Sequence, residues 1–338
     1  MDYTFLSFFY SKQFLLAFIP TFSITTLFIW CILRCKVFNR FLDIPNKRSL
    51  HIHPKLRLGG FAIIAAIIIS IFIYSSESIY LIPFLLTLIV LSFLDDLFSV
   101  KPFIRLTIQF LTTFIFLYTL DLQISYLFFI ALLFLLIWII NLYNFMDGSD
   151  GLAAGMSIIG FSFYTIMSIF VGDLNLAVLN TIIVAACISF LFFNFPPAKI
   201  FMGDIGSIPL GFLCGAIGVI GWHKLLWPMW FPIVVFSPFI VDASITLFKR
   251  FINKESLTEA HRSHYYQRAI LAGYSHKQIA LFSYCLMIFV GLIGISTLII
   301  NSQDIIIFMF ILLFLCFFLM MKFVDIIWAK HLSNKHKQ

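Results

Sequence analysis

The chain has 338 residues, of which 62% are hydrophobic and only 11% are charged, and its formal net charge is +7. Soluble domains are about half apolar and about one quarter charged. The composition therefore excludes a soluble globule, a disordered chain and a disulfide-stapled scaffold. It predicts an all-α fold, a polytopic integral membrane helix bundle.

Eleven apolar runs follow one another along the chain, and each predicts a membrane-spanning helix. They are residues 13–33, 59–74, 79–94, 103–120, 126–144, 152–171, 176–193, 207–222, 227–248, 278–299 and 305–321. No repeat of fixed period and no low-complexity linker separates them. We therefore expect a single integral membrane domain, residues 1–338, with about 11 transmembrane helices.

Lysine and arginine gather on one side of this predicted bundle. Of the 22 Lys and Arg residues, all but Lys12 and Lys224 fall in alternate loops or in the C-terminal tail. Because positive residues are retained on the cytoplasmic side, we expect the N-terminus outside and the C-terminus inside. The candidate catalytic loops are then cytoplasmic, near residues 34–58, 95–103, 144–151, 194–206 and 249–277.

Acidic residues stand where several apolar runs meet those inner loops. Asp95 and Asp96 end the run LIVLSFLDDLFSV. Asp147 and Asp150 lie in NLYNFMDGSDGLAAG, and Asp204 lies in FNFPPAKIFMGDIGS. A carboxylate at membrane depth costs a few kcal/mol unless it meets a cation or a polar cavity. A single acid at this depth is as often a solvated residue at a helix end as a functional one. The clustering of several acids in glycine-rich loops instead predicts one shared site.

The chemistry of the inner loops suits phosphate groups held together with a divalent cation. Mg²⁺ prefers oxygen ligands and is usually held by one or two carboxylates together with substrate phosphates. The first and last inner loops add polar and basic side chains: Asn46, Arg48, His51, Arg57, His261, Arg262 and His264. Retention of positive charge on the inner side explains most of the Lys and Arg residues, but it does not explain the histidines. Carboxylates that can bind a metal ion lie beside positively charged side chains that can bind phosphate. This combination indicates phosphoryl transfer.

These motifs resemble those of a known enzyme family. The patterns DxPNxRxxHxxPxxRxGG, an interfacial DD, NFMDGxDGLA, FNxPPAKIFMGDxGS and HRSHxYQR occur in this order from about residue 43 to residue 268. They resemble the polyprenyl-phosphate N-acetylhexosamine-1-phosphate transferases, glycosyltransferase family 4. The resemblance implies transfer of an N-acetylhexosamine-1-phosphate from a UDP-sugar to undecaprenyl phosphate, with Mg²⁺ (or Mn²⁺) as cofactor and release of UMP. It also implies a bacterial inner membrane with the active site on its cytoplasmic face.

Residue roles follow from this resemblance and from the basic loops. The resemblance implies metal binding by Asp204, Asp95, Asp96 and Asn144. Catalytic roles are expected for Asp95, Asp96, Asp147, Asp150, His261 and His264. Substrate binding is expected for Asn46, Arg48, His51, Arg57, Asn144, Lys199 and Arg262. One aspartate of the pair either deprotonates the lipid phosphate or acts as nucleophile in a two-step route, and the sequence leaves both open.

Two positions depart from the pattern of some family members. The peptidoglycan-precursor branch carries adjacent histidines in the last inner loop, whereas here Arg262 and Ser263 separate His261 from His264. This order favours the branch that starts O-antigen or related surface glycans. Ser99 occupies the position where some members carry a third acid, so we expect no direct role for it.

Two other classes of protein are compatible with a polytopic chain. A secondary transporter places ionisable residues and broken helices near the membrane midplane, and Pro232 and Pro238 could break the ninth run. A non-catalytic scaffold would leave the placement of the acids unexplained. As partners we expect the lipid bilayer, undecaprenyl phosphate and a UDP-N-acetylhexosamine, and no nucleic acid. A 6-deoxy sugar and a homodimer both stay open.

Overall fold

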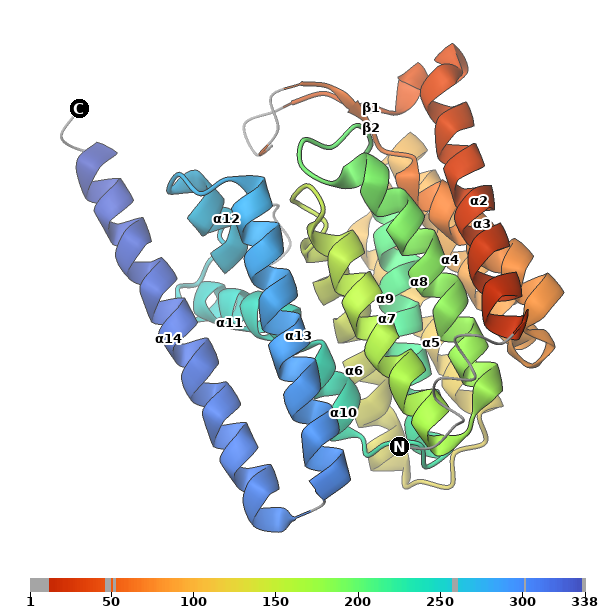
Figure 1. The fold of residues 1–338 in the computed structure, drawn as a ribbon. Coiled ribbons are helices and arrows are strands. Elements are labelled where there is room, and N and C mark those ends of the chain that lie inside the picture. Colours follow the sequence, from red (N-terminus) through yellow and green to blue (C-terminus); the bar gives the residue numbers. More distant parts are fainter. Residues whose placement is uncertain (1–11, 46–49, 51–52, 257–260, 301, 336–338) are drawn as a thin grey trace.

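The computed structural model describes residues 12–45, 50, 53–256, 261–300 and 302–335, and these residues are almost entirely helical (Figure 1). The elements in chain order are α2 (Lys12–Arg34), η1 (Lys36–Phe41), β1 (Leu42–Asp43), β2 (Lys55–Leu56), α3 (Gly59–Tyr74), η2 (Ser76–Leu81), α4 (Ile82–Phe98), α5 (Pro102–Thr119), α6 (Tyr126–Phe145), α7 (Leu152–Val171), α8 (Leu174–Asn194), α9 (Asp204–His223), α10 (Trp230–Val235), α11 (Ser237–Ile252), α12 (Tyr265–Leu271), α13 (His276–Ile300) and α14 (Gln303–Lys335). The prediction of an all-α polytopic bundle is confirmed.

Every apolar run of the sequence coincides with helix, but two runs depart from a regular span. Within the described residues, nine helices are long and apolar enough to cross a membrane. The run 59–74 forms α3, which has 16 residues. The run 227–248 is divided between α10 and α11, because Pro238 in the first turn of α11 has no N–H and restricts the backbone before it. The count of about 11 spans and the N-out orientation stay predictions.

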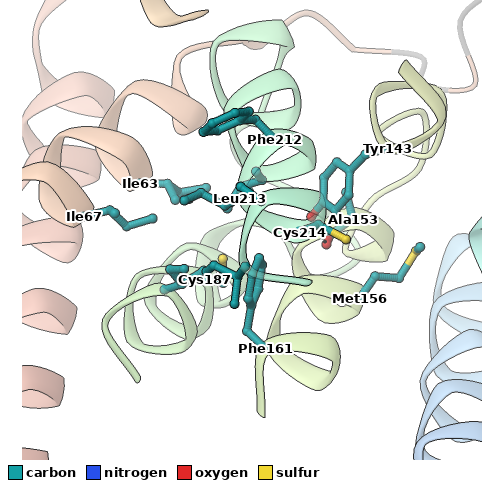
Figure 2. Packing of buried hydrophobic residues seen from close by; sticks show 14 of the residues in the cluster. Ile63, Ile67, Tyr143, Ala153, Met156, Phe161, Cys187, Phe212, Leu213 and Cys214 are labelled. Carbon is teal, nitrogen blue, oxygen red and sulfur yellow. Dashed lines mark hydrogen bonds between the residues drawn. The ribbon is translucent and has the colours of Figure 1, made fainter. Parts of the chain in front are cut away.

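Helix α9 lies at the centre of the bundle. Figure 2 shows Phe212, Leu213 and Cys214 of α9 surrounded by side chains from α3, α6, α7 and α8. Helix α9 is almost entirely buried, in contrast to the other apolar helices. Small residues allow its neighbours to approach closely: a Cβ added at Gly60 of α3 would lie 2.3 Å from the Cα of Gly206 in α9. This contact brings the first inner loop to the beginning of α9.

The loops that the sequence predicts to be cytoplasmic gather at one end of the bundle, the upper end in Figure 1. There β1 and β2 pair in antiparallel register, with Leu42 opposite Leu56. The same end carries α12 and the turn between α6 and α7. Helices α13 and α14 lie along one side of the bundle, and most of α14 is exposed, as expected of a helix that faces lipid. This arrangement places all the candidate loops side by side.

Candidate active site

Backbone hydrogen bonds join the first inner loop to the segment before α9. The N–H groups of Gly59 and Gly60 donate to the carbonyl oxygens of Phe201 and Met202, each over 2.9 Å. Leu56 and Ile200 also form a parallel bridge. Two loops that are far apart in the chain therefore form one rigid platform from which Arg57 and Asp204 project.

Gly203 makes the close approach of these loops possible. Its φ of +70° lies in the left-handed region, which an L side chain rarely adopts. A Cβ at this position would also lie 2.7 Å from the carbonyl oxygen of Arg57. A glycine is therefore required directly before Asp204, the residue predicted to bind the metal.

Carboxylates from two helices meet around one arginine. Nη1 of Arg105, in the first turn of α5, lies 2.5 Å from Oδ2 of Asp95 at the end of α4. The same nitrogen lies 3.7 Å from Oδ2 of Asp204, the first residue of α9. The three side chains are 32%, 13% and 20% exposed, in that order. The structure therefore brings together two of the predicted metal ligands, with a cation between them.

Arg57 lies in the field of further acids. Burial opposes its positive charge, but nearby carboxylates outweigh the loss of hydration and raise the pKa of Arg57 above its ordinary value. These carboxylates are Asp204, Asp43, Asp96 and Asp147, with Asp204 contributing most. Arg57 stays protonated at any working pH, and the site therefore holds two fixed positive charges among five acids.

The turn between α6 and α7 closes another side of the site. Ser207 Oγ donates to Oδ1 of Asn144 over 2.6 Å, and the Asn144 amide also hydrogen-bonds the carboxylate of Asp204. The Gly203 N–H donates to Oδ2 of Asp147 over 2.9 Å. Burial and repulsion from Asp204 raise the pKa of Asp147 well above its ordinary value, and these effects exceed the stabilisation by the Gly203 hydrogen bond. The fold therefore favours the protonated form of this carboxyl more than water does.

Asp150 holds two loops together. Its Oδ2 accepts a hydrogen bond of 2.9 Å from the Ala198 N–H and lies 3.5 Å from the ammonium of Lys55. Asn194 supports the same junction, since it accepts from the Gly151 N–H and donates to the Ile200 carbonyl. This geometry favours a positioning role for Asp150 over direct contact with a reacting phosphate.

The histidine motif packs against the α6–α7 turn. His264 is 2% exposed, and its Nδ1 lies 3.6 Å from Oδ1 of Asp242. Its ring centroid lies 5.6 Å from that of Phe145. Tyr266, in the first turn of α12, donates its hydroxyl to the Phe145 carbonyl over 2.9 Å. Asp242 accepts the N–H groups of Tyr265 and Tyr266 and thereby fixes the start of α12.

His261 lies beside His264, with their ring centroids 4.9 Å apart and their planes tilted by 31°. Ser263 Oγ hydrogen-bonds its Nδ1 over 2.7 Å. Burial, followed by the nearby His264 and Arg250, lowers the pKa of His261 to about 4. His261 is therefore neutral at physiological pH and can accept or donate a hydrogen bond without carrying charge.

The remaining residues predicted for the site lie outside the acid cluster or outside the described residues. Lys199 is exposed, and its backbone N–H donates to the Phe193 carbonyl. Arg262 is partly exposed in the segment before α12. The predictions for Asn46, Arg48 and His51 lie outside the described residues.

Arg105 is a central residue that the sequence interpretation did not select. In the sequence, Arg105 is one of many positive charges on the predicted inner side. Retention of positive residues on the cytoplasmic side already explains their number. Its distinguishing signal is its place in the first turn of α5, three residues after Pro102 and one short loop after Asp95 and Asp96. A short connection between two helices brings such positions together.

The donor set fits a hard divalent ion that shares its ligands with substrate. Among the residues that the structure describes, no three His, Cys, Asp or Glu side chains form a ready metal-binding group. Asp95 and Asp204 instead offer carboxylate oxygens beside one another. Mg²⁺ is commonly bound by one or two carboxylates, with water and substrate phosphates completing its shell. These two residues would hold it, with the other predicted ligands Asp96 and Asn144 close to Asp204.

These contacts describe a multi-pass membrane protein with an acid- and arginine-lined site at one end of its helix bundle. The family model for glycosyl transferase family 4 matches residues 78–222. A probable undecaprenyl-phosphate N-acetylglucosaminyl 1-phosphate transferase of Bacillus subtilis (strain 168) is 30% identical over 299 residues, which cover 82% of each chain. The chain belongs to this family of phosphosugar transferases.

Two phospho-N-acetylmuramoyl-pentapeptide-transferases match over shorter segments. A phospho-N-acetylmuramoyl-pentapeptide-transferase of Staphylococcus aureus (strain bovine RF122 / ET3-1) is 42% identical over 96 residues, 28% of this chain and 30% of its own length. The enzyme of the same name from Desulforamulus reducens is 30% identical over 177 residues, 52% of this chain and 51% of its own. The chain therefore spans about half or less of these two relatives.

Proposed function

We propose that this protein transfers an N-acetylhexosamine-1-phosphate from a UDP-sugar to undecaprenyl phosphate and releases UMP. The reaction would take place at the cytoplasmic face of a bacterial inner membrane. Its product, an undecaprenyl-diphosphate-sugar, would start an O-antigen or a related cell-surface polysaccharide. The name of the Bacillus subtilis relative, which contains this lipid acceptor and a sugar 1-phosphate, supports the proposal.

The observation that carries the proposal is the meeting of Asp95, Asp204 and Arg105 at the end of the bundle where the inner loops gather. Both substrates are anionic, so the site must hold phosphates while it keeps carboxylates close. Arg57 and Arg105 supply positive charge for the phosphates. A bound Mg²⁺, or Mn²⁺ in its place, would neutralise the diphosphate and polarise the β-phosphate.

The bond changes are those of a phosphoryl transfer. An oxygen of the lipid phosphate forms a bond to the β-phosphorus, and the bond from that phosphorus to the bridging oxygen breaks. The bonding electron pair leaves with UMP. In a direct route one aspartate of the pair Asp95 and Asp96 takes the proton of the lipid phosphate. In a two-step route one of these aspartates attacks first and the lipid phosphate displaces it.

A mostly hydrophobic hollow beside the candidate site could bind the prenyl chain of the lipid acceptor. The hollow lies between α7, α11, α12, α13 and α14, next to the α6–α7 turn. Its lining is mostly hydrophobic, with Asp242 as its charged residue. Because the hollow lies close to Tyr266 and Phe145, it suits a prenyl chain whose phosphate reaches the acids from the membrane.

Replacement of Asp204 by alanine tests the proposal. We expect Asp204→Ala to reduce Mg²⁺-dependent UMP release at least 100-fold, because the variant loses an oxygen ligand and a partner of Arg57 and Arg105. The assay uses purified protein in detergent with undecaprenyl phosphate and a panel of UDP-N-acetylhexosamines, including 6-deoxy sugars, and scores UMP and lipid-linked product.

The matched control is Asp173→Asn, which removes a carboxylate that is paired with Lys224 at the opposite end of the bundle. It should keep UMP release within about twofold of wild type. Full activity of Asp204→Ala, or no turnover of any UDP-sugar by the wild type, contradicts the proposal.

A secondary transporter is the alternative function, and the broken helix formed by α10 and α11 is the observation that favours it. In a transporter the binding groups lie at such breaks near the midplane. Here the acid cluster lies instead at the ends of α4 and α9. Turnover of UDP-sugar in detergent, where no gradient exists, distinguishes the transferase from the transporter.

A further inference from the structure

Arg105 occupies the position between two carboxylates where a divalent ion would be expected. A single nitrogen, Nη1, lies 2.5 Å from Asp95 and 3.7 Å from Asp204. An ion held by both carboxylates would compete with this guanidinium for the same oxygens. Ion binding at this point and the Arg105 ion pairs therefore oppose each other.

The two arginines of the site differ in how firmly they are held. Arg57 belongs to the platform of β2, and its backbone N–H donates to the Phe41 carbonyl over 3.1 Å. Four carboxylates surround its charge. Arg105 projects from the first turn of α5, and at 32% its side chain is more exposed than either of its partners. A long, partly exposed side chain can change its rotamer without a change in the backbone.

Without a cation, the carboxylates of Asp95 and Asp204 would repel each other and separate. Like charges that share a site disfavour each other's ionised form. A guanidinium between them removes this repulsion and keeps both oxygens facing a common point. The ligand set is then formed before an ion arrives, and the ion need only replace the guanidinium.

We propose that Arg105 is an intramolecular counter-ion that holds the metal ligands in place and is displaced from them when the divalent ion binds. The freed guanidinium lies at the edge of the site and turns to a phosphate of the substrate. Because it concerns the ion of the transferase, this inference rests on the proposed function. Arg105 acts here as a positioning residue toward the ion and as a binding residue toward the substrate.

The test measures ion binding without catalysis. Purified protein in detergent, without nucleotide or lipid phosphate, is titrated with Mn²⁺, and free Mn²⁺ is followed by electron paramagnetic resonance. Removal of a competing internal cation should strengthen binding, so we expect Arg105→Gln to bind Mn²⁺ at least tenfold more tightly than wild type. The same variant should turn over substrate more slowly, because its phosphate partner is lost.

The matched control is Arg40→Gln, which removes one positive charge from the same inner end. The Arg40 side chain is exposed, and its guanidinium lies over the ring of Phe41. Its Mn²⁺ affinity should stay within about threefold of wild type, because exposed charges at longer range are screened by salt. Equal Mn²⁺ affinities for Arg105→Gln and Arg40→Gln overturn the inference.

A second variant covers the case in which Arg105→Gln does not fold. Arg105→Lys keeps the charge, but a single ammonium cannot bridge two carboxylates as a guanidinium does. We expect it to bind Mn²⁺ two- to fivefold more tightly than wild type, and an affinity equal to or below wild type overturns the inference.

The titration also separates this inference from the proposed function. Wild-type protein that binds Mn²⁺ through Asp204, but without any effect of Arg105, overturns the inference alone. Wild-type and variant proteins that bind no Mn²⁺, even with UDP-sugar present, overturn both the inference and the metal assignment.

Discussion

At the scale of single residues, several carboxylates of the site have a partner that offsets the cost of their burial. Asp95 pairs with Arg105, Asp150 pairs with Lys55, and Asp147 accepts a backbone N–H from Gly203. A buried charge without such a partner would cost several kcal/mol. The partners are lysine, arginine and backbone N–H groups, and the kind of partner distinguishes a structural carboxylate from one that can bind substrate or metal. Asp150 is committed to loop contacts, whereas Asp95 and Asp204 share a cation that substrate or metal can replace.

His261 gives a prediction at this scale. Its pKa is lowered to about 4 in the folded protein, below the ordinary value near 6.5. Between these two values the unfolded chain binds the additional proton, so the His261 contribution to stability is complete above about pH 6.5 and is lost as the pH falls toward 4. We therefore expect the thermal midpoint of the wild type to fall more steeply from pH 6.5 to 4.5 than that of His261→Gln.

The comparison between these two proteins isolates His261 from the other groups that titrate in this range. His264 and Arg250 face the His261 ring and contribute to its lowered pKa, and both are retained in the variant. Parallel pH profiles of the thermal midpoint for wild type and His261→Gln would show that the imidazole is not held neutral by the fold.

At the scale of elements, the short helix α12 depends on its neighbours. A helix of seven residues is not stable alone. Asp242 of α11 accepts two N–H groups at its start. Asp325 of α14 binds Arg268 of α12 over 2.8 Å and Lys249 of α11 over 3.0 Å. The end of α14 therefore supports the loop that carries the histidine motif.

Asp325→Asn should weaken the ion pairs with Lys249 and Arg268 that hold α12 in place, and it changes no residue of the acid cluster. We expect faster hydrogen exchange in α12 and a severalfold loss of kcat/KM, because His264 and Tyr266 would no longer be held against the α6–α7 turn. The ion pairs are partly exposed, so the thermal midpoint should change little. Asp304→Asn, an exposed carboxylate at the other end of the same helix, is the control and should match wild type in both measurements.

At the scale of the whole molecule, the bundle separates a reactive end from a nearly uncharged lipid-facing body. The candidate loops gather at one end, and the opposite end carries the Lys224–Asp173 pair. Helix α9 connects the two, with Asp204 at its first residue and His223 at its last. The distribution of Lys and Arg predicts that the reactive end faces the cytoplasm.

This orientation is tested with single cysteines in a chain whose six native cysteines are replaced. Leu225→Cys lies exposed just after α9, and Lys330→Cys lies exposed near the end of α14. In intact spheroplasts an impermeant thiol reagent should label Leu225→Cys, and it should label Lys330→Cys only after permeabilisation. The reverse pattern would place the acid cluster on the outer side.

The class of fold, and the stretches of chain expected to carry the chemistry, can be predicted from the order of the amino acids. Apolar runs, inner-side positive charge and motifs such as NFMDGSDGLA are properties of consecutive residues. Membrane insertion responds to those properties locally. The bundle and the family could therefore be predicted before any contact was known.

Which side chains are partners becomes evident only when the helices are packed together. The bridge of Arg105 between Asp95 and Asp204, the use of Asp150 as a loop tie and the docking of His264 on Phe145 join segments from different helices. Such pairs depend on helix crossings like that of Gly60 and Gly206, where packing of whole elements sets the distance. No local pattern encodes a distance of this kind, because it is fixed by how every other helix fits around α9.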